Sequence, residues 1–356
     1  MATATIISKI AAGDRIGFDE ALTLFERADF HELGRLAHAV RLRKHPEPVV
    51  SYVVDRNINY SNVCICGCRF CAFYRPPAHA EAYVLTREQL TAKIEETLQL
   101  GGTQILLQGG HHPDLPLSFY EEMLRFIKDR FSIHIHAFSP PEIVHFAKLD
   151  RTGVPAVIAR LIAAGLDSIP GGGAEILVDS VRQRVSPNKC TAAEWLEVME
   201  EAHHQGLRTT ATMMFGHDER PSHRLEHLLA LRALQDRTGG FTAFIPWPFQ
   251  PANTLLSRSA ETPVAYLRLL ALSRLVLDNF DNIQASWVTM GPKVAQLALR
   301  FGANDFGSTM IEENVVAAAG VHFRLSVAEI RHQITDAGFR ARQRTMAYQW
   351  IGPDDG

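Results

Sequence analysis

The chain has 356 residues, of which 46% are hydrophobic and 21% charged, and its formal net charge is −3. This near-neutral balance lacks the basic footprint of a protein that binds nucleic acid or an anionic membrane surface, and no apolar run reaches the roughly 18 residues that a membrane span needs. The first residues carry no basic and apolar export signal. We therefore expect a cytoplasmic protein in a reducing compartment, with neither nucleic acid nor membrane as a partner.

Two segments near the start of the chain, residues 18–25 and 31–43, carry apolar residues at three- and four-residue spacing. This periodicity predicts amphipathic helices. We expect residues 1–45 to form a helical cap that packs in front of the main domain.

From residue 46 onward, short β-branched and apolar runs alternate with amphipathic helical segments. The predicted strands are 50–56, 104–108, 133–138, 167–169, 209–215, 241–246, 283–289 and 304–306; helices are predicted at 192–205 and 224–237, and Thr86 and Gln89 form a capping box before another. Eight such units predict an α/β fold, a closed (β/α)8 barrel of the TIM type over residues 46–320. A partly open barrel and a doubly wound sheet are the alternatives. Residues 321–356 are expected to form a helical extension packed on the barrel.

Four of the five cysteines fall within residues 64–71, in the order Cys-Ile-Cys-Gly-Cys-Arg-Phe-Cys. Thiolates are the usual ligands of iron–sulfur clusters, and three of them, Cys64, Cys68 and Cys71, can hold three irons of a 4Fe–4S cluster and leave the fourth iron open to an external ligand. A zinc site with Cys66 or His79 as a fourth ligand is an alternative, and so is a redox pair formed by Cys68 and Cys71.

The two other cysteines have no predicted ligand role. Cys66 lies between two predicted ligands and is expected to point away from the cluster, and Cys190 is expected to be a structural thiol.

Polar residues and glycines that follow the predicted strands are further site candidates, because such barrels form their active sites at the carboxyl ends of the strands. These residues are Asn59, Tyr60, Gly109, Gly110, Ser139, Glu142, Glu175, His217, Glu219, Trp247, Gln250, Asn253 and Ser308. The alternative is that many of them serve only as the glycines and caps that strand-to-helix loops require. Ser139 and Glu142, on either side of two prolines, fit a helix start equally well.

The cysteine motif, with the aromatic Phe70 before its last cysteine, resembles the radical S-adenosylmethionine (SAM) superfamily. Longer stretches between about residues 50 and 320 resemble one family within it, the dehypoxanthine futalosine cyclases of menaquinone biosynthesis. These stretches are RNINYSNVC (56–64), IHAFSPPEI (135–143), SIPGGGAE (168–175), TTATMMFGH (209–217) and FIPWPFQPANT (244–254). The last stretch separates the chain best from aminofutalosine synthase and the FO synthase subunits, although Pro248 departs from the threonine expected there. Those enzymes, and a non-enzymatic iron–sulfur or zinc protein, are the alternatives.

The resemblance implies a 4Fe–4S cluster and SAM as cofactors, dehypoxanthine futalosine as the substrate and a reducing electron donor of the flavodoxin or ferredoxin type. It implies that a 5′-deoxyadenosyl radical removes the hydrogen from the ribose C4′ and that the resulting carbon radical closes onto the benzoate ring. The loss of one electron and one proton then restores aromaticity.

The resemblance also implies roles for the candidate residues. Gly109 and Gly110 would contact SAM, and Phe70, Ser139, Glu142 and Glu175 are further candidates for the cofactor site; His217, Glu219 and Glu175 are the catalytic candidates, including the final proton acceptor. Among the substrate candidates, Arg56 or another arginine at the barrel mouth would pair with the carboxylate, and Trp247 would stack on the aromatic ring. Asn59, Tyr60, Gln250, Asn253 and Ser308 would contact the remaining polar groups.

Overall fold

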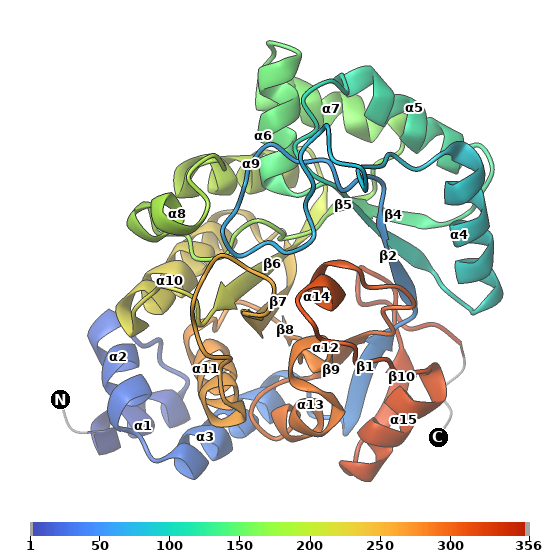
Figure 1. Ribbon diagram of the computed structural model, residues 1–356. Helices are drawn as coiled ribbons and strands as arrows, with labels where there is room; N and C mark the ends of the chain where they lie inside the picture. The colour runs from blue at the N-terminus through green and yellow to red at the C-terminus, as the bar shows by residue number, and fades with distance from the viewer. Residues whose placement is uncertain (1–2, 353–356) are drawn as a thin grey trace.

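The structure is a computed structural model that describes residues 3–352, with helices arranged around a central set of strands (Figure 1). The helices are α1 (Thr3–Ala12), α2 (Phe18–Arg27), α3 (Phe30–Lys44), α4 (Arg87–Gln99), α5 (Leu117–Lys128), α6 (Pro140–Leu149), α7 (Val154–Ala164), α8 (Asp179–Val185), α9 (Ala192–His204), α10 (Pro221–Thr238), α11 (Pro263–Val276), α12 (Trp287–Met290), α13 (Pro292–Ala298), α14 (Val315–Ala318) and α15 (Val327–Asp336). The strands are β1 (Val49–Val53), β2 (Asp55–Asn59), β3 (Gln104–Gln108), β4 (His134–Ala137), β5 (Ser168–Ile169), β6 (Arg208–Phe215), β7 (Phe241–Pro248), β8 (Asn282–Ile283), β9 (Asp305–Ser308) and β10 (Arg340–Gln343). None of the helices in residues 3–352 has the length and apolar character needed to cross a bilayer.

The strands from β2 to β8 form one parallel sheet in sequence order, and β1 forms a second parallel sheet with β9 and β10. The two sheets meet where β8 approaches β9, through a parallel bridge between Gln284 and Asp305. Two hydrogen bonds support this seam: the N–H of Ala285 donates to the Asp305 carbonyl (2.9 Å), and the N–H of Asn304 donates to the Ile283 carbonyl (3.1 Å). The predicted eight-unit barrel is therefore confirmed, and it closes through a short seam.

The predicted first strand, 50–56, is two strands in the structure. Along β1 the chain pairs with β10 on one edge and β9 on the other, whereas along β2 the edge that faced β10 pairs with β3. The change of neighbour falls at Val54, whose carbonyl accepts a hydrogen bond from the N–H of Thr103 (3.1 Å). Every residue of both strands is buried, as expected for parallel strands covered on both faces.

The predicted strand 283–289 was wrong over most of its length. β8 ends at Ile283, and the apolar residues that follow begin helix α12 at Trp287. The Trp287 side chain is buried, and its ring N–H donates to the carbonyl of Ser308 (2.9 Å). A short apolar run fits either element, and here tertiary burial of the indole decides for the helix.

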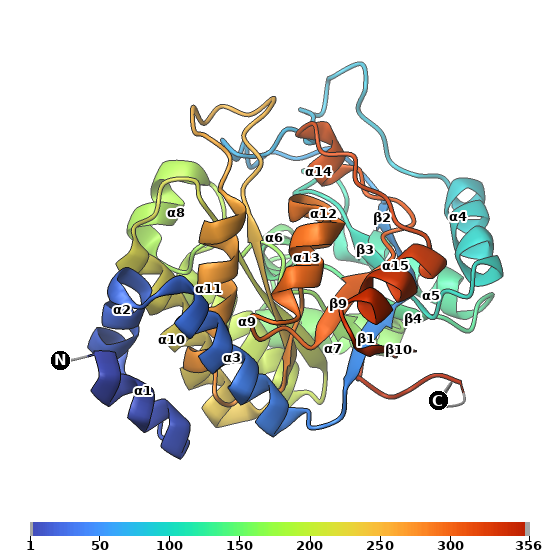
Figure 2. The ribbon, with the colours of Figure 1, turned by 90° about the horizontal axis from the view of Figure 1, so that it is seen from below.

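Both ends of the chain pack on the barrel. Helices α2 and α3 contact α10 and α11 on its outer surface, as Figure 2 shows. The C-terminal segment was expected to be helical, but it contains strand β10 as well as helix α15, and β10 extends the β1 sheet.

After β10 the chain turns inward at the amino-terminal end of the barrel. Arg344 forms an ion pair with Asp305, and both side chains are buried, with 4% and 0% exposure. The guanidinium also lies over the Tyr348 ring, 4.0 Å from its centroid. Arg344, Met346 and Tyr348 all line the central cavity, so the tail forms part of its floor.

We expect the buried ion pair at this floor to be critical for stability. Arg344→Met leaves the carboxylate of Asp305 buried without its cation, which should lower the free energy of unfolding by about 3–5 kcal/mol in chemical denaturation. Arg237→Met is the matched control, because the Arg237–Glu200 pair is exposed and should contribute at most about 1 kcal/mol. Equal losses in the two variants would contradict this assignment.

Candidate active site

The cysteine loop begins just after β2 and is held by its own backbone and by neighbouring loops. The N–H of Cys64 donates to the carbonyl of Arg75 (3.0 Å), and the N–H of Cys71 donates to the carbonyl of Cys68 (3.1 Å). The structure thus keeps the three predicted ligands in one ordered loop at the carboxyl end of the barrel.

Hydrogen bonds around Cys64 favour its thiolate form. Its Sγ accepts the backbone N–H groups of Cys66 (3.4 Å) and His111 (3.3 Å). The neighbouring Cys66 side chain, together with these N–H donors, lowers the pKa of Cys64 to about 6 against the opposing effect of burial. The Cys66 side chain also lowers the pKa of Cys68, whereas burial raises that of Cys71.

Cys66 itself points to a neighbouring histidine. Its Sγ lies 3.0 Å from Nδ1 of His111, whose ring stacks on that of His145 with 4.7 Å between the centroids. The Cys66 side chain therefore takes part in the contacts that hold the loop against His111.

The donor chemistry of the loop fits an iron–sulfur cluster better than a single metal ion. One zinc ion needs its ligands at a single point, and within residues 3–352 no three His, Cys, Asp or Glu side chains converge in that way. A cluster is held differently, because each thiolate binds a separate iron and the sulfur ligands surround a larger object. Cys64, Cys68 and Cys71 are the residues that would hold it.

The two glycines after β3 permit close packing of the loop. A Cβ on Gly110 would lie 2.4 Å from the Val63 carbonyl oxygen and 2.6 Å from Cβ of Cys64, and a Cβ on Gly109 would lie 2.3 Å from the Tyr60 ring. Glycine is therefore required at both positions by protein contacts alone. Contact of either residue with SAM remains a prediction.

Glu142 is a buried acceptor that joins three segments. Its carboxylate accepts hydrogen bonds from the hydroxyls of Tyr60 and Ser139 (both 2.6 Å) and from the N–H groups of Gly109 (3.0 Å) and Ser139 (2.8 Å). Burial raises the pKa of this carboxyl. Ser139 and Glu142 form the capping box of α6, so the structure supports the helix-start alternative for this pair.

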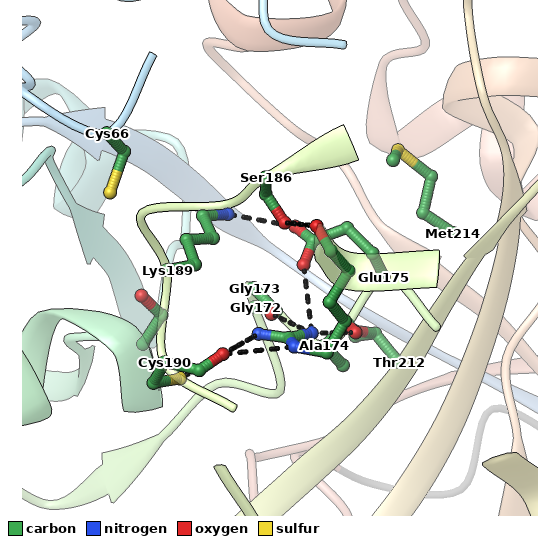
Figure 3. A network of polar contacts seen from close by, with 12 residues as sticks. Cys66, Gly172, Gly173, Ala174, Glu175, Ser186, Lys189, Cys190, Thr212 and Met214 are labelled. Atoms are coloured by element: carbon green, nitrogen blue, oxygen red, sulfur yellow. Dashed lines mark hydrogen bonds and ion pairs between the residues drawn. The ribbon is translucent and has the colours of Figure 1, made fainter. Parts of the chain in front are cut away.

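Glu175 lies in a buried network of charges with two residues that sequence reasoning missed (Figure 3). Its carboxylate is 2.9 Å from Nζ of Lys189 and 3.5 Å from Nη1 of Arg182. Burial acts to raise the pKa of Glu175, but these two cations hold it below its ordinary value. Lys189 also lies over the ring of Phe70, at 5.2 Å from its centroid. No local sequence signal marks Lys189, because it becomes part of the site only through the fold.

His217 and Glu219 are bound by backbone groups of their own loop. Nδ1 of His217 accepts the N–H of Asp218 (2.8 Å), and Nε2 lies 3.0 Å from the Met214 carbonyl. Glu219 accepts the N–H groups of Gly216 (2.7 Å) and His217 (3.0 Å) and pairs with Arg224 at 2.6 Å. Neither side chain lines the central cavity.

The central cavity, of about 250 Å³, occupies the lumen of the barrel and has both polar and apolar lining residues. It is lined by Val53, Asp55, Asn57, Gln104, Leu106, Gln108, His136, Pro170, Gly171, Gly172, Thr210, Thr212, Ala243, Ile245, Trp247, Gln284, Ala285, Ser286, Trp287, Val288, Thr289, Ser308, Met310, Glu313, Val315, Val316, Arg344, Met346 and Tyr348. Trp247 and Ser308 are the predicted substrate residues in this set. Asp55, Gln104, Gln108 and His136, from β2, β3 and β4, were missed, because strands buried on both faces give no apolar–polar alternation that would show which side chains enter the lumen.

The other predicted substrate residues make contacts outside the lining of this cavity. Arg56 pairs with Glu96 and lies 3.6 Å from Glu312. The Asn253 amide donates to the carbonyl of Ala318 (2.9 Å), and the Gln250 amide donates to the carbonyl of Pro248 (3.1 Å).

Two more of the predicted substrate residues are likewise held by protein groups. Oδ1 of Asn59 accepts from the Asn314 amide (3.3 Å). The Tyr60 hydroxyl is the donor to Glu142 described above, and its ring lies in a cluster with Tyr120 and Phe138.

Family comparisons agree with the barrel and the cysteine loop. Residues 58–231 match a model described as "Radical SAM superfamily", and residues 238–354 match one described as "CofH/MqnC C-terminal region". Together these features define a radical SAM enzyme, a class that uses a 4Fe–4S cluster and SAM.

Solved structures show the same fold at low sequence identity. An FeFe-hydrogenase maturase from Carboxydothermus hydrogenoformans has a TM-score of 0.75 and 19% identity, with 97% of this chain and 80% of that chain covered. Methylornithine synthase has a TM-score of 0.71 and 16% identity, with 94% and 97% covered.

Curated relatives are much closer in sequence. A cyclic dehypoxanthine futalosine synthase from Halalkalibacterium halodurans is 47% identical, with 97% of this chain and 94% of the relative covered, and one from Streptomyces coelicolor is 44% identical, with 97% and 88% covered. An aminodeoxyfutalosine synthase from Thermus thermophilus is 40% identical, with 88% and 86% covered. The chain belongs to the radical SAM family that includes the cyclic dehypoxanthine futalosine synthases.

Gly110→Ala should disturb the cysteine loop. The added methyl group would overlap backbone and Cβ atoms, which cannot move without shifting Cys64, and overpacking of this kind costs about 1–3 kcal/mol. We expect a lower iron and sulfide content per chain after anaerobic reconstitution. The control is Gly153→Ala, where the new Cβ would meet only Cδ of Pro155 at 3.6 Å. Equal cluster content in both variants would show that the close approach is dispensable.

His217 should make stability depend on pH. Burial lowers its pKa, so the folded chain binds this proton less readily than the unfolded chain does. Its contribution is therefore present at neutral pH and is lost as the pH falls below about 6.5, the ordinary histidine value. The destabilisation caused by His217→Gln should be smaller at about pH 5.5 than at about pH 7.5 in urea unfolding. A destabilisation that is the same at both pH values would count against a buried neutral imidazole.

Proposed function

We propose that this chain cyclises dehypoxanthine futalosine in menaquinone biosynthesis. The observation that carries the proposal is the identity of 47% and 44%, over nearly the whole chain, to two cyclic dehypoxanthine futalosine synthases. The cavity supports it, because its mixed character suits a substrate that joins a sugar to an aromatic acid.

Apolar residues of the cavity lining are suited to the aromatic ring. Trp247 and Ile245 come from β7, and Met310 follows β9. Flat contact with an indole would hold the ring at a fixed angle, which matters because ring closure requires a defined approach of carbon to carbon.

Polar residues of the cavity lining offer hydrogen-bonding groups to the sugar. Asp55 and Asn57 come from β2, Gln104 from β3 and His136 from β4. Burial strongly lowers the pKa of His136, so its imidazole is neutral and can take part in hydrogen bonds without a charge. It lines the cavity directly, which makes it an additional candidate for contact with the sugar, and His217, Glu219 and Glu175 remain the candidates for the final proton acceptor.

Helix α14 covers part of the cavity and would help to exclude water. Val315 and Val316 line the cavity, and Glu313 caps the helix by accepting the N–H groups of Val316 (2.7 Å), Val315 (3.2 Å) and Ala317 (3.3 Å). A dry cavity would protect a reactive carbon centre from quenching.

The cofactors would supply the chemistry that protein side chains cannot, namely homolytic removal of the ribose hydrogen. Cys64, Cys68 and Cys71 would hold the cluster; Gly109, Gly110, Phe70 and Glu175 remain the cofactor-site candidates. A reducing donor of the flavodoxin or ferredoxin type is proposed as the source of the electron.

The test is an anaerobic assay with reconstituted protein, SAM, a reductant and dehypoxanthine futalosine. We expect 5′-deoxyadenosine together with a cyclised product that lacks two hydrogens of the substrate, detected by mass spectrometry. Cys64→Ala should abolish both, because the cluster loses a ligand, whereas Cys190→Ala should retain both.

Two outcomes would contradict the proposal. Deoxyadenosine without cyclised product would exclude the cyclase activity. The next substrates to test would be those named for two 4-hydroxyphenyl transferases, which are 40% and 42% identical to this chain. Full activity of Cys64→Ala would overturn the ligand assignment itself.

A further inference from the structure

The segment between α8 and α9 packs directly on the cysteine loop. The N–H of Arg69 donates to the Val185 carbonyl (2.9 Å), and the Asn188 amide donates to the Cys66 carbonyl (3.0 Å). These contacts fix the next residue, Lys189, beside the loop.

The Lys189 ammonium is buried between Glu175 and the cysteines. Its side chain is 15% exposed; Nζ is 2.9 Å from a Glu175 oxygen and 5.2 Å from the centroid of the Phe70 ring. Phe70 immediately precedes Cys71. The ammonium that lies over Phe70 is therefore beside the part of the loop that carries Cys68 and Cys71.

Two other buried charges of this network, those of Arg182 and Glu175, are opposite in sign and largely cancel. Arg182 donates to the carbonyls of Cys190 (3.0 and 2.7 Å) and Ala174 (2.6 Å), and its charge lies opposite Glu175. The negative charge of Glu175 is therefore shared between two cations. The network of Arg182, Glu175 and Lys189 keeps one net positive charge, on the side that faces the cysteine loop.

A thiolate-bound cluster is the anion that this excess charge fits. Three thiolates bring more negative charge than the oxidised cluster core carries positive, and reduction adds one more electron. In a buried site, where screening by water is weak, a nearby cation favours the more negative, reduced state.

We infer that Lys189 is a positioning residue whose ammonium compensates for the negative charge of the cluster and raises its reduction potential. Glu175 has the opposite effect, because it weakens the field of Lys189 at the cluster. This role concerns how readily the cluster accepts its electron and does not depend on which substrate the cavity binds.

The test is a redox titration of the reconstituted holoprotein without substrate, followed by electron paramagnetic resonance. In Lys189→Met we expect the ratio of reduced to oxidised cluster at a fixed potential to fall about tenfold, which corresponds to 59 mV for a one-electron couple. Lys189→Arg should restore most of the ratio because it keeps the charge, and Glu175→Gln should shift the ratio the other way. Lys293→Met, at an exposed site, is the control and should leave the ratio unchanged.

The opposite signs expected for Lys189→Met and Glu175→Gln separate an electrostatic role from a structural one. Shifts of the same sign, or an unchanged midpoint in Lys189→Met with full iron content, would overturn the inference. So would a shift that arises only when SAM is present, since the ammonium would then act on SAM. If Lys189→Met fails to take up the cluster, Glu175→Gln still decides by the sign of its shift, and a large shift in the charge-conserving Lys189→Arg would count against the inference. Because no substrate is used, failure of the cyclisation assay would leave this result standing.

Discussion

The closed barrel depends on one extended segment that serves two sets of neighbours. Residues 49–59 pair first with β9 and β10 and then with β3, so the same stretch of chain completes one sheet and begins the other. The hydrogen bonds that close the opposite seam, between β8 and β9, are few. The position of the cysteine loop follows from this arrangement, because the loop leaves the carboxyl end of β2 and meets the ends of β3 and of α8 there.

The buried charges are balanced at one end of the lumen and unbalanced at the other. At the floor, Arg344 meets Asp305 directly and the pair is enclosed. Near the cysteine loop, Lys189 shares its partner Glu175 with Arg182, which leaves a surplus of positive charge. The ion pair at the floor is internally balanced, whereas the unbalanced charge beside the loop is suited to an anionic cofactor.

The strand–helix alternation and the cysteine spacing were sufficient to predict the barrel and the loop that would hold the cluster. The directions of side chains were harder to predict, because strands buried on both faces show no apolar–polar alternation. Arg56 could therefore not be distinguished from its neighbours as a residue facing the cavity, although Asp55 and Asn57 are the residues of β2 that line it. His217 and Glu219 were chosen for their residue types. Only the structure shows that their side chains already accept hydrogen bonds from backbone N–H groups. Lys189 lies far along the chain from the cysteines, and long-range contacts of this kind leave no local pattern.

The pairing of β1 has a consequence for how the protein is made. Its partners, β9 and β10, lie more than 200 residues further along the chain, so β1 is synthesised long before either edge can be satisfied. At ordinary translation rates this interval is on the order of tens of seconds, during which an apolar strand has two open edges. Contacts between residues so distant in sequence also slow folding. The nascent chain is thus exposed to misassembly through β1, and the barrel can close only after β9 has been synthesised.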